Sequence, residues 1–291
     1  RVLPRLKAML GDERPFELEW VSIYTFQCRR MKDFRHQRCV FVGDAAHQVS
    51  PFGARGANSG FQDSDALMWK LALVMRGLAP EKLIDTYHDE RAYAADENIL
   101  NSTRSTDFIT PKSATSKLFR NAALSLARHH PFARKLVNSG RLSLPSFLTT
   151  SPLNTPDSDA FAGDMVPGAP MDDAPVQHDG KDSWLLDHLG HRFQCLLFVD
   201  DVGQIDAAHL AALQSLQKGA IVVEPLVISL RAGHVPGVQV LVDAQGLFAK
   251  RYDAKPGSVW LTRPDQHVTA RWRHFDEAAV RAALARSTCN A

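Results

Sequence analysis

Apolar and polar residues in the first quarter of the chain change their spacing twice. Residues 16–26 alternate, with Phe16, Trp20 and Phe26 on one face, and this period of two predicts a strand with an aromatic face. The short apolar run at 39–42 predicts a buried strand. From about Gly60 the apolar residues recur at helical spacing, which predicts a long helix.

The rest of the chain predicts a mixture of helices and strands. Helices are expected at 1–10, 81–101, 119–137, 206–217 and 277–285, and strands at 192–199, 220–230 and 238–242, followed by a hairpin at 259–270. The hairpin has its turn at Pro264 and Asp265, two residue types that favour turns. The fold class predicted from this mixture is α/β (α+β).

Proline marks a change of character between the two halves. Six prolines lie between residues 143 and 175, together with Ser, Thr and Asp. Such a composition predicts an extended linker that runs over the surface. We therefore expect a domain boundary near residues 161–166.

Composition narrows the class of protein. The 291 residues suffice for one large domain or two of ordinary size, and 45% apolar with 23% charged residues is typical of soluble globular proteins. The formal net charge of +2 gives no reason to expect a nucleic acid or a membrane surface as partner. The four cysteines form no CxxC pair, so neither a zinc ribbon nor a dithiol redox pair is expected, and we predict a cytoplasmic protein with reduced thiols.

A glycine-rich loop between the predicted strand at 39–42 and the long helix is the strongest candidate for chemistry. Gly43 and Asp44 follow the strand at its carboxyl end, where open α/β sheets bind ligands. Pro51, Gly53, Gly56 and Gly60 then keep side chains away from the backbone. The loop is expected to present free N–H groups at a helix N-terminus, which attracts negative charge.

The residues of this stretch follow a known pattern. They are Gly43-Asp44-Ala45-Ala46-His47, then Pro51, then Gly53-Ala54-Arg55-Gly56-Ala57-Asn58-Ser59-Gly60, then Asp63 through Leu67, Trp69 and Lys70. This segment resembles the flavin-binding motif of FAD-dependent aromatic hydroxylases, which include phenol and hydroxyphenylpropionate hydroxylases. One departure is Ala66, where the family has Asn.

The resemblance implies a set of cofactor-binding residues. They are Gly43, Asp44, Pro51, Gly53, Gly56, Ala57 and Asn58. In the family the matching Asp accepts hydrogen bonds from the ribityl chain, although an Asp here could instead cap a turn. The amides of Ala57 and Asn58 are expected to stabilise the negative charge of reduced flavin.

Other polar and aromatic residues near the motif receive less specific expectations. Tyr24 either faces the aromatic substrate, as the resemblance implies, or packs in the core. His47 is expected to be a hydrogen-bonding loop residue, and a metal site with Asp44 is rejected because two ligands make no site. Arg55 is expected to point to solvent and Lys70 to lie on the surface. No catalytic base is predicted.

The resemblance also implies a division into domains. Residues 1–162 resemble the C-terminal part of a Rossmann-like FAD and substrate domain: 1–36 would end the substrate sheet, 37–110 would hold the flavin motif with its helices, and 111–162 a helix and linker. Residues 163–291 resemble a thioredoxin-like domain without CxxC, with a packing or homodimer-contact role. No GxGxxG follows an N-terminal strand, so we expect this chain to be the C-terminal portion of a longer enzyme, without its ADP-binding part.

The implied function is an FAD-dependent, NAD(P)H-consuming monooxygenase that hydroxylates a phenolic compound with O2 in aromatic catabolism. One alternative is a truncated, inactive fragment that acts only in association. Another keeps the flavin fold but carries out epoxidation or halogenation. The residues do not distinguish between substrates, between positions of hydroxylation, or between NADH and NADPH.

Overall fold

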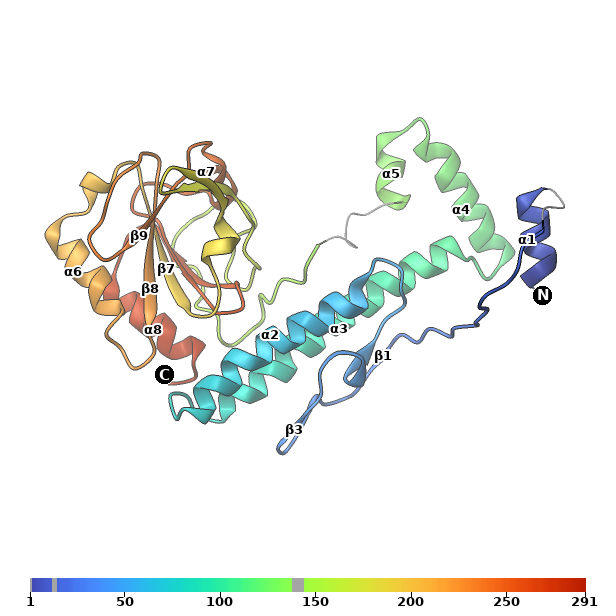
Figure 1. Cartoon of the computed structure of the whole chain (residues 1–291), viewed down its shortest axis with the longest axis horizontal. Coiled ribbons are helices and arrows are strands. Elements are labelled where there is room, and N and C mark those ends of the chain that lie inside the picture. The colour runs from blue at the N-terminus through green and yellow to red at the C-terminus, as the bar shows by residue number, and fades with distance from the viewer. Residues whose placement is uncertain (1, 12–14, 138–143) are drawn as a thin grey trace.

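The computed structural model describes residues 2–11, 15–137 and 144–291. An elongated helical part lies beside a rounded α/β unit (Figure 1). The helical part contains α1 (Val2–Leu10), α2 (Arg55–Met75), α3 (Lys82–Ile109), α4 (Ala114–Ala127) and α5 (Pro131–Val137). The predicted mixed α/β class is confirmed. The single helix expected at 119–137 is divided in two, because Pro131 starts a new helix.

Helices α2 and α3 run side by side as a hairpin (Figure 1). Gly77, at φ +69°, ends α2, and the N–H groups of Gly77 and Leu78 donate to the carbonyls of Val74 and Leu73. This is the Schellman arrangement, which satisfies the last carbonyls of a helix. Leu67 of α2 and Tyr87 of α3 belong to a shared buried cluster, so the two helices form one packed element.

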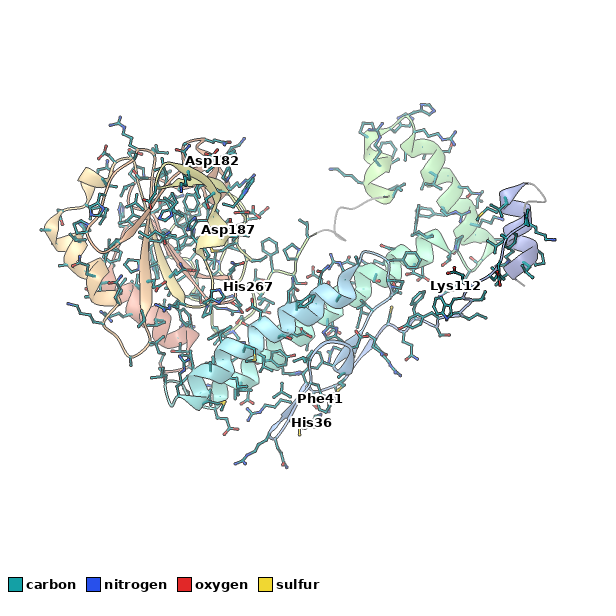
Figure 2. All side chains as sticks on the ribbon, viewed as in Figure 1. His36, Phe41, Lys112, Asp182, Asp187 and His267 are labelled. Atoms are coloured by element: carbon teal, nitrogen blue, oxygen red, sulfur yellow. The ribbon has the colours of Figure 1, made fainter. Side chains whose placement is uncertain are left out.

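Short strands precede α2. They are β1 (Arg29–Arg30) paired with β4 (His47–Gln48), and β2 (Arg35–His36) paired with β3 (Cys39–Val40), with the 3-10 turn η1 (Gly43–Ala45) between β3 and β4. The prediction of a buried strand at 39–42 was wrong: only two of its residues are in a strand, and Cys39 is exposed. Figure 2 shows His36 and Phe41 close together beside this small hairpin.

The strand predicted at 16–26 is also absent. This segment is described in full and carries no strand, and Trp20 and Ile23 are 83% and 91% exposed. A period-two pattern forms a strand only where a neighbouring strand and a core face receive it. The described residues supply neither to this segment, so its backbone stays unpaired.

The α/β unit is built on a seven-stranded sheet. The strands are β5 (Pro175–His178), β6 (Lys181–Trp184), β7 (Phe193–Val199), β8 (Val223–Ser229), β9 (Gln239–Val242), β10 (Val259–Thr262) and β11 (Val268–Trp272). Their order is β11-β10-β7-β8-β9-β5-β6, with β7, β8 and β9 parallel and the other pairings antiparallel. The predicted hairpin at 259–270 is confirmed as β10 and β11.

Helices cover both faces of this sheet. Helices α6 (Ala207–Leu216) and α8 (Glu277–Ser287) share a buried cluster with Leu197 and Val199 of β7. Helix α7 (Leu247–Tyr252) and the 3-10 turn η3 (Leu185–His188) share another with Leu196 and Phe198, and a further turn, η4 (Val202–Gln204), precedes α6. Burial on both faces explains why every residue of β7 is buried and why its sequence is almost continuously apolar.

The proline-rich stretch was predicted as a surface linker. Residues 156–158 and 162–164 are exposed, but the prediction was wrong for the segments on either side of them. Leu148, Leu153 and Met165 are buried, and Leu153 and Met165 belong to buried clusters that include strand residues of the C-terminal sheet. The Leu148 N–H donates to the Gly168 carbonyl at 2.7 Å. Gly168 has φ +93°, and a Cβ there would lie 2.4 Å from the Leu148 carbonyl carbon, so only glycine fits. The apolar residues between the prolines make this extended segment part of the core.

The helical part and the α/β unit share buried side chains. Trp69 of α2 and Leu83 of α3 belong to the same cluster as the strand residues of β7, and the Trp69 ring meets Phe193 edge-on at 5.6 Å. The end of the α2–α3 hairpin is therefore fixed against the sheet. Among the described residues no helix combines the length and apolar character needed to cross a membrane.

Candidate functional site

The glycine loop leads directly into α2, which begins at Arg55, five residues before the predicted start. Ala54 precedes it at φ +52°, and the Ala54 N–H donates to the Pro51 carbonyl at 3.1 Å. The amides of Gly56 and Ala57 lie in the first turn, where a helix has no carbonyl of its own to bond them. The Asn58 side chain donates to the Ala54 carbonyl at 2.8 Å.

A cavity of about 270 Å³ adjoins this first turn. It is lined by Gly53, Arg55, Asn58, Ser59, Gln62, Asn98 and residues 144–146. Two of the predicted cofactor residues, Gly53 and Asn58, are thus brought to one cavity, whereas Gly43, Asp44, Pro51, Gly56 and Ala57 are not in its lining. Complete ligand sites usually measure about 300–1,000 Å³, so this cavity has room for part of a large cofactor.

Asp44 lies in the turn η1, next to α2. Its side chain is exposed and bonds to none of the described residues. Gly43, at φ +56°, lies against Gly60 of α2, where a Cβ on Gly60 would be 3.5 Å from the Gly43 Cα. The turn therefore packs on the helix at van der Waals distance, and the carboxylate of Asp44 is left available to a ligand.

A hydrogen-bonded group of three side chains, Asp63, His47 and Arg91, holds this turn against α2. Asp63 of α2 is completely buried, and one of its oxygens accepts the Gly43 N–H at 2.9 Å and bonds His47 Nε2 at 2.7 Å. The other oxygen accepts a hydrogen bond from Arg91 Nε at 2.6 Å. His47 forms a hydrogen bond as predicted, but it lies in the short strand β4 and not in a loop.

Opposing effects act on the Asp63 carboxyl group. Burial raises its pKa, but the hydrogen bond from His47 and the charge of Arg91 outweigh burial and hold the pKa below the usual value. Asp63 is therefore ionised at neutral pH. An ionised carboxylate is an acceptor only, which suits its contacts with the Gly43 amide and Arg91.

Arg55 is buried, whereas Tyr24 is exposed. Arg55 was predicted to point to solvent, and this was wrong: the residue is 8% exposed, bonds Asn98, and donates to the Leu144 carbonyl at 2.9 Å. Tyr24 is 74% exposed, its ring lies 4.9 Å from that of Phe26, and it does not line the cavity beside α2. The structure therefore does not bring Tyr24 to the glycine loop.

A second buried network lies where α2 and α3 meet the α/β unit. Glu90 of α3 accepts hydrogen bonds from Lys70 Nζ at 2.6 Å and from Arg263 at 2.5 and 3.3 Å. Arg263 also donates to Asp265 at 2.9 and 2.6 Å, and Trp69 Nε1 donates to the same carboxylate at 3.1 Å. Figure 2 shows His267, which follows this pair, on the side of the unit that faces the helices.

The four charges of this network balance one another. Burial raises the pKa of Glu90, but Arg263 and Lys70 outweigh it and lower the pKa to about 2. The same competition between burial and Arg263 leaves the pKa of Asp265 well below its usual value. Both carboxylates are thus charged at neutral pH and lie against the guanidinium group of Arg263 and the amine of Lys70. Burial lowers the pKa of Lys70, and the charge of Glu90 opposes that effect.

Lys70 was predicted on the surface, and this was wrong, because the residue is completely buried. A signal for this was present in the motif. Asp63, Leu67 and Lys70 are spaced i, i+4 and i+7 and so lie on one helical face, and the structure buries all three. The sequence signal was the position of the lysine within the apolar stripe, which indicates a buried and paired charge.

Comparison with known proteins gives two family matches. Residues 2–102 match the family described as FAD binding domain, and residues 173–287 match the HcaD C-terminal domain. The first contains the glycine loop, the Asp44 turn and most of α3. The second contains the seven-stranded sheet.

Curated relatives agree with these matches. The chain is 32% identical over 276 residues to 6-methylpretetramide 4-monooxygenase of Streptomyces rimosus, which covers 92% of this chain and 47% of that protein. It is 30% identical over 273 residues to 4-methyl-5-nitrocatechol 5-monooxygenase of Burkholderia sp, covering 88% and 44%. The chain spans about half the length of the curated relatives it matches.

Solved structures share the fold. The flavin-dependent monooxygenase PieE, in complex with FAD and substrate, superposes with a TM-score of 0.68 at 26% identity, over 92% of this chain and 50% of PieE. RebC-10x has a TM-score of 0.71 at 21% identity, over 100% of this chain and 53% of its own, and shows the fold alone. The matched FAD binding domain and the monooxygenase relatives place the chain in the family of FAD-dependent aromatic hydroxylases.

Proposed function

We propose that this chain supplies the isoalloxazine- and ribityl-facing part of a monooxygenase that hydroxylates a phenolic compound, using FAD, NAD(P)H and O2. The observation that carries the proposal is the exposed carboxylate of Asp44, which bonds to none of the described residues and lies in a turn that contacts α2. Homologous enzymes act on aromatic compounds, as the names of the relatives state.

The residues of the chain fit a flavin. Asp44 is an acceptor available to a sugar-like hydroxyl, and the first turn of α2 offers amide donors at the positive end of a helix dipole. Gly53 and Asn58 line the cavity, and neither has a large side chain that would fill it. Gly43 takes φ +56° in the turn that carries Asp44, and the Pro51 carbonyl accepts the Ala54 N–H directly before α2.

Bound FAD would supply the redox chemistry and the activation of oxygen. This chain would bind the cofactor and orient it. Asp44 holds the ribityl hydroxyls, and the amides of Gly56 and Ala57 stabilise negative charge on the cofactor ring. This pair replaces the predicted Ala57 and Asn58, because α2 begins at Arg55 and Asn58 is already its fourth residue. Losing one such donor typically costs about 3 kcal/mol in the barrier. Tyr24 remains a proposed substrate contact.

A comparison of two flavins tests the cofactor assignment. If this chain contacts only the flavin end, FMN and FAD bind it with equal affinity, because the ADP half of FAD finds no partner here. Fluorescence quenching of each flavin during titration measures this. Asp44→Ala weakens both flavins about tenfold, as expected for the loss of a charged hydrogen-bond acceptor.

Asp89→Ala is the matched control, since Asp89 is an exposed aspartate on α3 outside the cavity lining. Two results contradict the proposal: equal loss of affinity in both variants, or FAD binding that is much tighter than FMN binding. Substrate-stimulated NAD(P)H oxidation by the full-length enzyme, screened over phenols and hydroxybenzoates, tests the reaction itself.

We also propose that the C-terminal unit is a thioredoxin-like domain with a contact role. The support is its connectivity: parallel β7-α6-β8, then antiparallel β10 and β11 followed by α8, with β10 next to β7. The burial of Leu153 in one cluster with strand residues of this sheet supports a boundary before residue 153 and not at 163.

Association is a second candidate function, favoured by one observation. The unpaired segment around Trp20 and Ile23 exposes large apolar side chains, of a kind that marks interaction sites when contiguous. Sedimentation of the chain over a range of concentrations tests this. A monomer at all concentrations, with no change on Trp20→Glu, rules out self-association through this segment.

A further inference from the structure

We infer that the C-terminal unit fixes the turn bearing Asp44 through two clusters of buried charges that meet at consecutive residues of α3. The residues that carry this link are Arg263, Glu90, Arg91 and Asp63, which act as positioning residues. The inference rests on the proposed function only in so far as Asp44 is taken as a cofactor ligand.

The first step joins the C-terminal hairpin to α3. Arg263 follows β10, and its guanidinium group bonds Glu90 at 2.5 and 3.3 Å. Asp265 holds the other edge of the same group at 2.9 and 2.6 Å. The guanidinium group is planar and has five donors, so contacts on both edges fix its plane and hence the position of Glu90.

The second step runs through α3 to the turn. Glu90 and Arg91 are consecutive residues, so one peptide unit separates the interface cluster from the cluster under the turn. Arg91 Nε donates to Asp63 at 2.6 Å, and the other oxygen of Asp63 accepts the Gly43 N–H at 2.9 Å. Gly43 is the residue directly before Asp44.

The burial of these groups makes the coupling effective. Glu90, Arg263 and Asp63 have side chains with no exposed surface, and Arg91 is 3% exposed. Water cannot replace a displaced partner at such sites, so loss of one contact changes the geometry of the next. The turn itself has only three residues and one internal backbone bond, from Ala46 N–H to the Gly43 carbonyl at 2.9 Å. Asp63 therefore fixes the start of the turn at Gly43, and the Met31 N–H fixes its end by donating to the Ala46 carbonyl at 2.8 Å.

Amide hydrogen exchange at Gly43 tests the coupling without any flavin. Arg263→Lys keeps the charge and removes the fork of donors. Exchange at Gly43 is expected to rise about tenfold, which corresponds to a coupling within the 0.5–2 kcal/mol range seen for such residues. Arg271→Lys is the matched control: Arg271 is also buried and bonds Asp157 with two nitrogens at 3.0 and 2.7 Å, but its partners all lie within the C-terminal unit. It should leave Gly43 exchange unchanged.

The double variant separates coupling from general loosening. With Asp63→Asn in place, the link to Gly43 is already weakened, so adding Arg263→Lys should change Gly43 exchange by less than twofold. Additive effects, or equal effects of Arg263→Lys and Arg271→Lys, overturn the inference. If Arg263→Lys does not fold, Asp265→Asn takes its place with the same expected outcome. Flavin titration of the same variants shows separately whether the cofactor assignment holds, since exchange is measured on the protein alone.

Discussion

Lys70 provides the most direct test of the buried charge network, because its replacement leaves an uneven charge. The side chain has no exposed surface, and its ammonium group donates to Glu90 at 2.6 Å and to Thr86 at 2.9 Å. In Lys70→Met, Glu90 loses one of its two cationic partners and keeps Arg263, which it shares with Asp265. Breaking a buried pair by removing one partner costs about 3–5 kcal/mol of unfolding free energy.

A second substitution should restore part of this loss. In Lys70→Met/Glu90→Gln the remaining charges are Arg263 and Asp265, which balance. The double variant is therefore expected to be more stable than Lys70→Met alone, the opposite of additive behaviour. Urea unfolding followed by circular dichroism, extrapolated linearly to water, gives the unfolding free energies of the unsubstituted protein, Lys70→Met and the double variant.

Lys112 supplies the control for this experiment. It pairs with Asp107 at 3.0 Å, but its side chain is 84% exposed and Figure 2 shows it on the surface of the helical part. Lys112→Met should change the unfolding free energy by less than about 1 kcal/mol. A loss of similar size at Lys70 and Lys112, or a double variant less stable than Lys70→Met, refutes the reasoning from charge balance.

Three further predictions concern pH, backbone and thiols. The folded-state pKa of Glu90, about 2, lies below its usual value of 4.5, so the stability it contributes is present above pH 4.5 and is lost as the pH falls towards 2; acid titration of unfolding should be flatter for Glu90→Gln, by on the order of 3 kcal/mol over that window. Gly168→Ala, at a left-handed position without room for a Cβ, should lower the unfolding free energy by about 3 kcal/mol in urea melts. With a thiol reagent, exposed Cys28 and Cys39 should react in the folded protein, whereas Cys195, which is buried with a pKa raised to about 12, should react only on unfolding; a fast third thiol assigned to Cys195 contradicts this.

The glycine loop and its helix could be predicted from the sequence because the signals there are local. Glycines, a proline and the apolar stripe that includes Leu67 lie within about two dozen residues, and backbone preferences act over such distances. The start of α2 at Arg55 was missed because Ala54 takes a left-handed conformation that its side chain does not favour. Tertiary packing of the loop, not propensity, sets that boundary.

The segment at 16–26 shows the opposite limit. Its alternation is a strong strand signal, yet the structure leaves Trp20 and Ile23 exposed and unpaired. A strand depends on partners that its own sequence does not contain. The same holds for Cys39 and Val40, whose strand extends only as far as its two-residue partner at 35–36. Pattern alone thus identifies a surface that could pair, and the neighbours decide whether it does.

The interface network was beyond sequence analysis for a related reason. Glu90 and Arg263 are 173 positions apart, and neither the helix pattern nor the hairpin pattern indicates the other as its partner. Yet Trp69 and Lys70, at the end of the recognised motif, are the α2 residues that bond at this interface, Trp69 to Asp265 and Lys70 to Glu90. Since the same helix carries the glycine loop at its other end, one α-helix has its first turn at the proposed cofactor site and its later turns against the C-terminal unit. A substitution at the interface should therefore be judged by its effect on the loop as well as on stability.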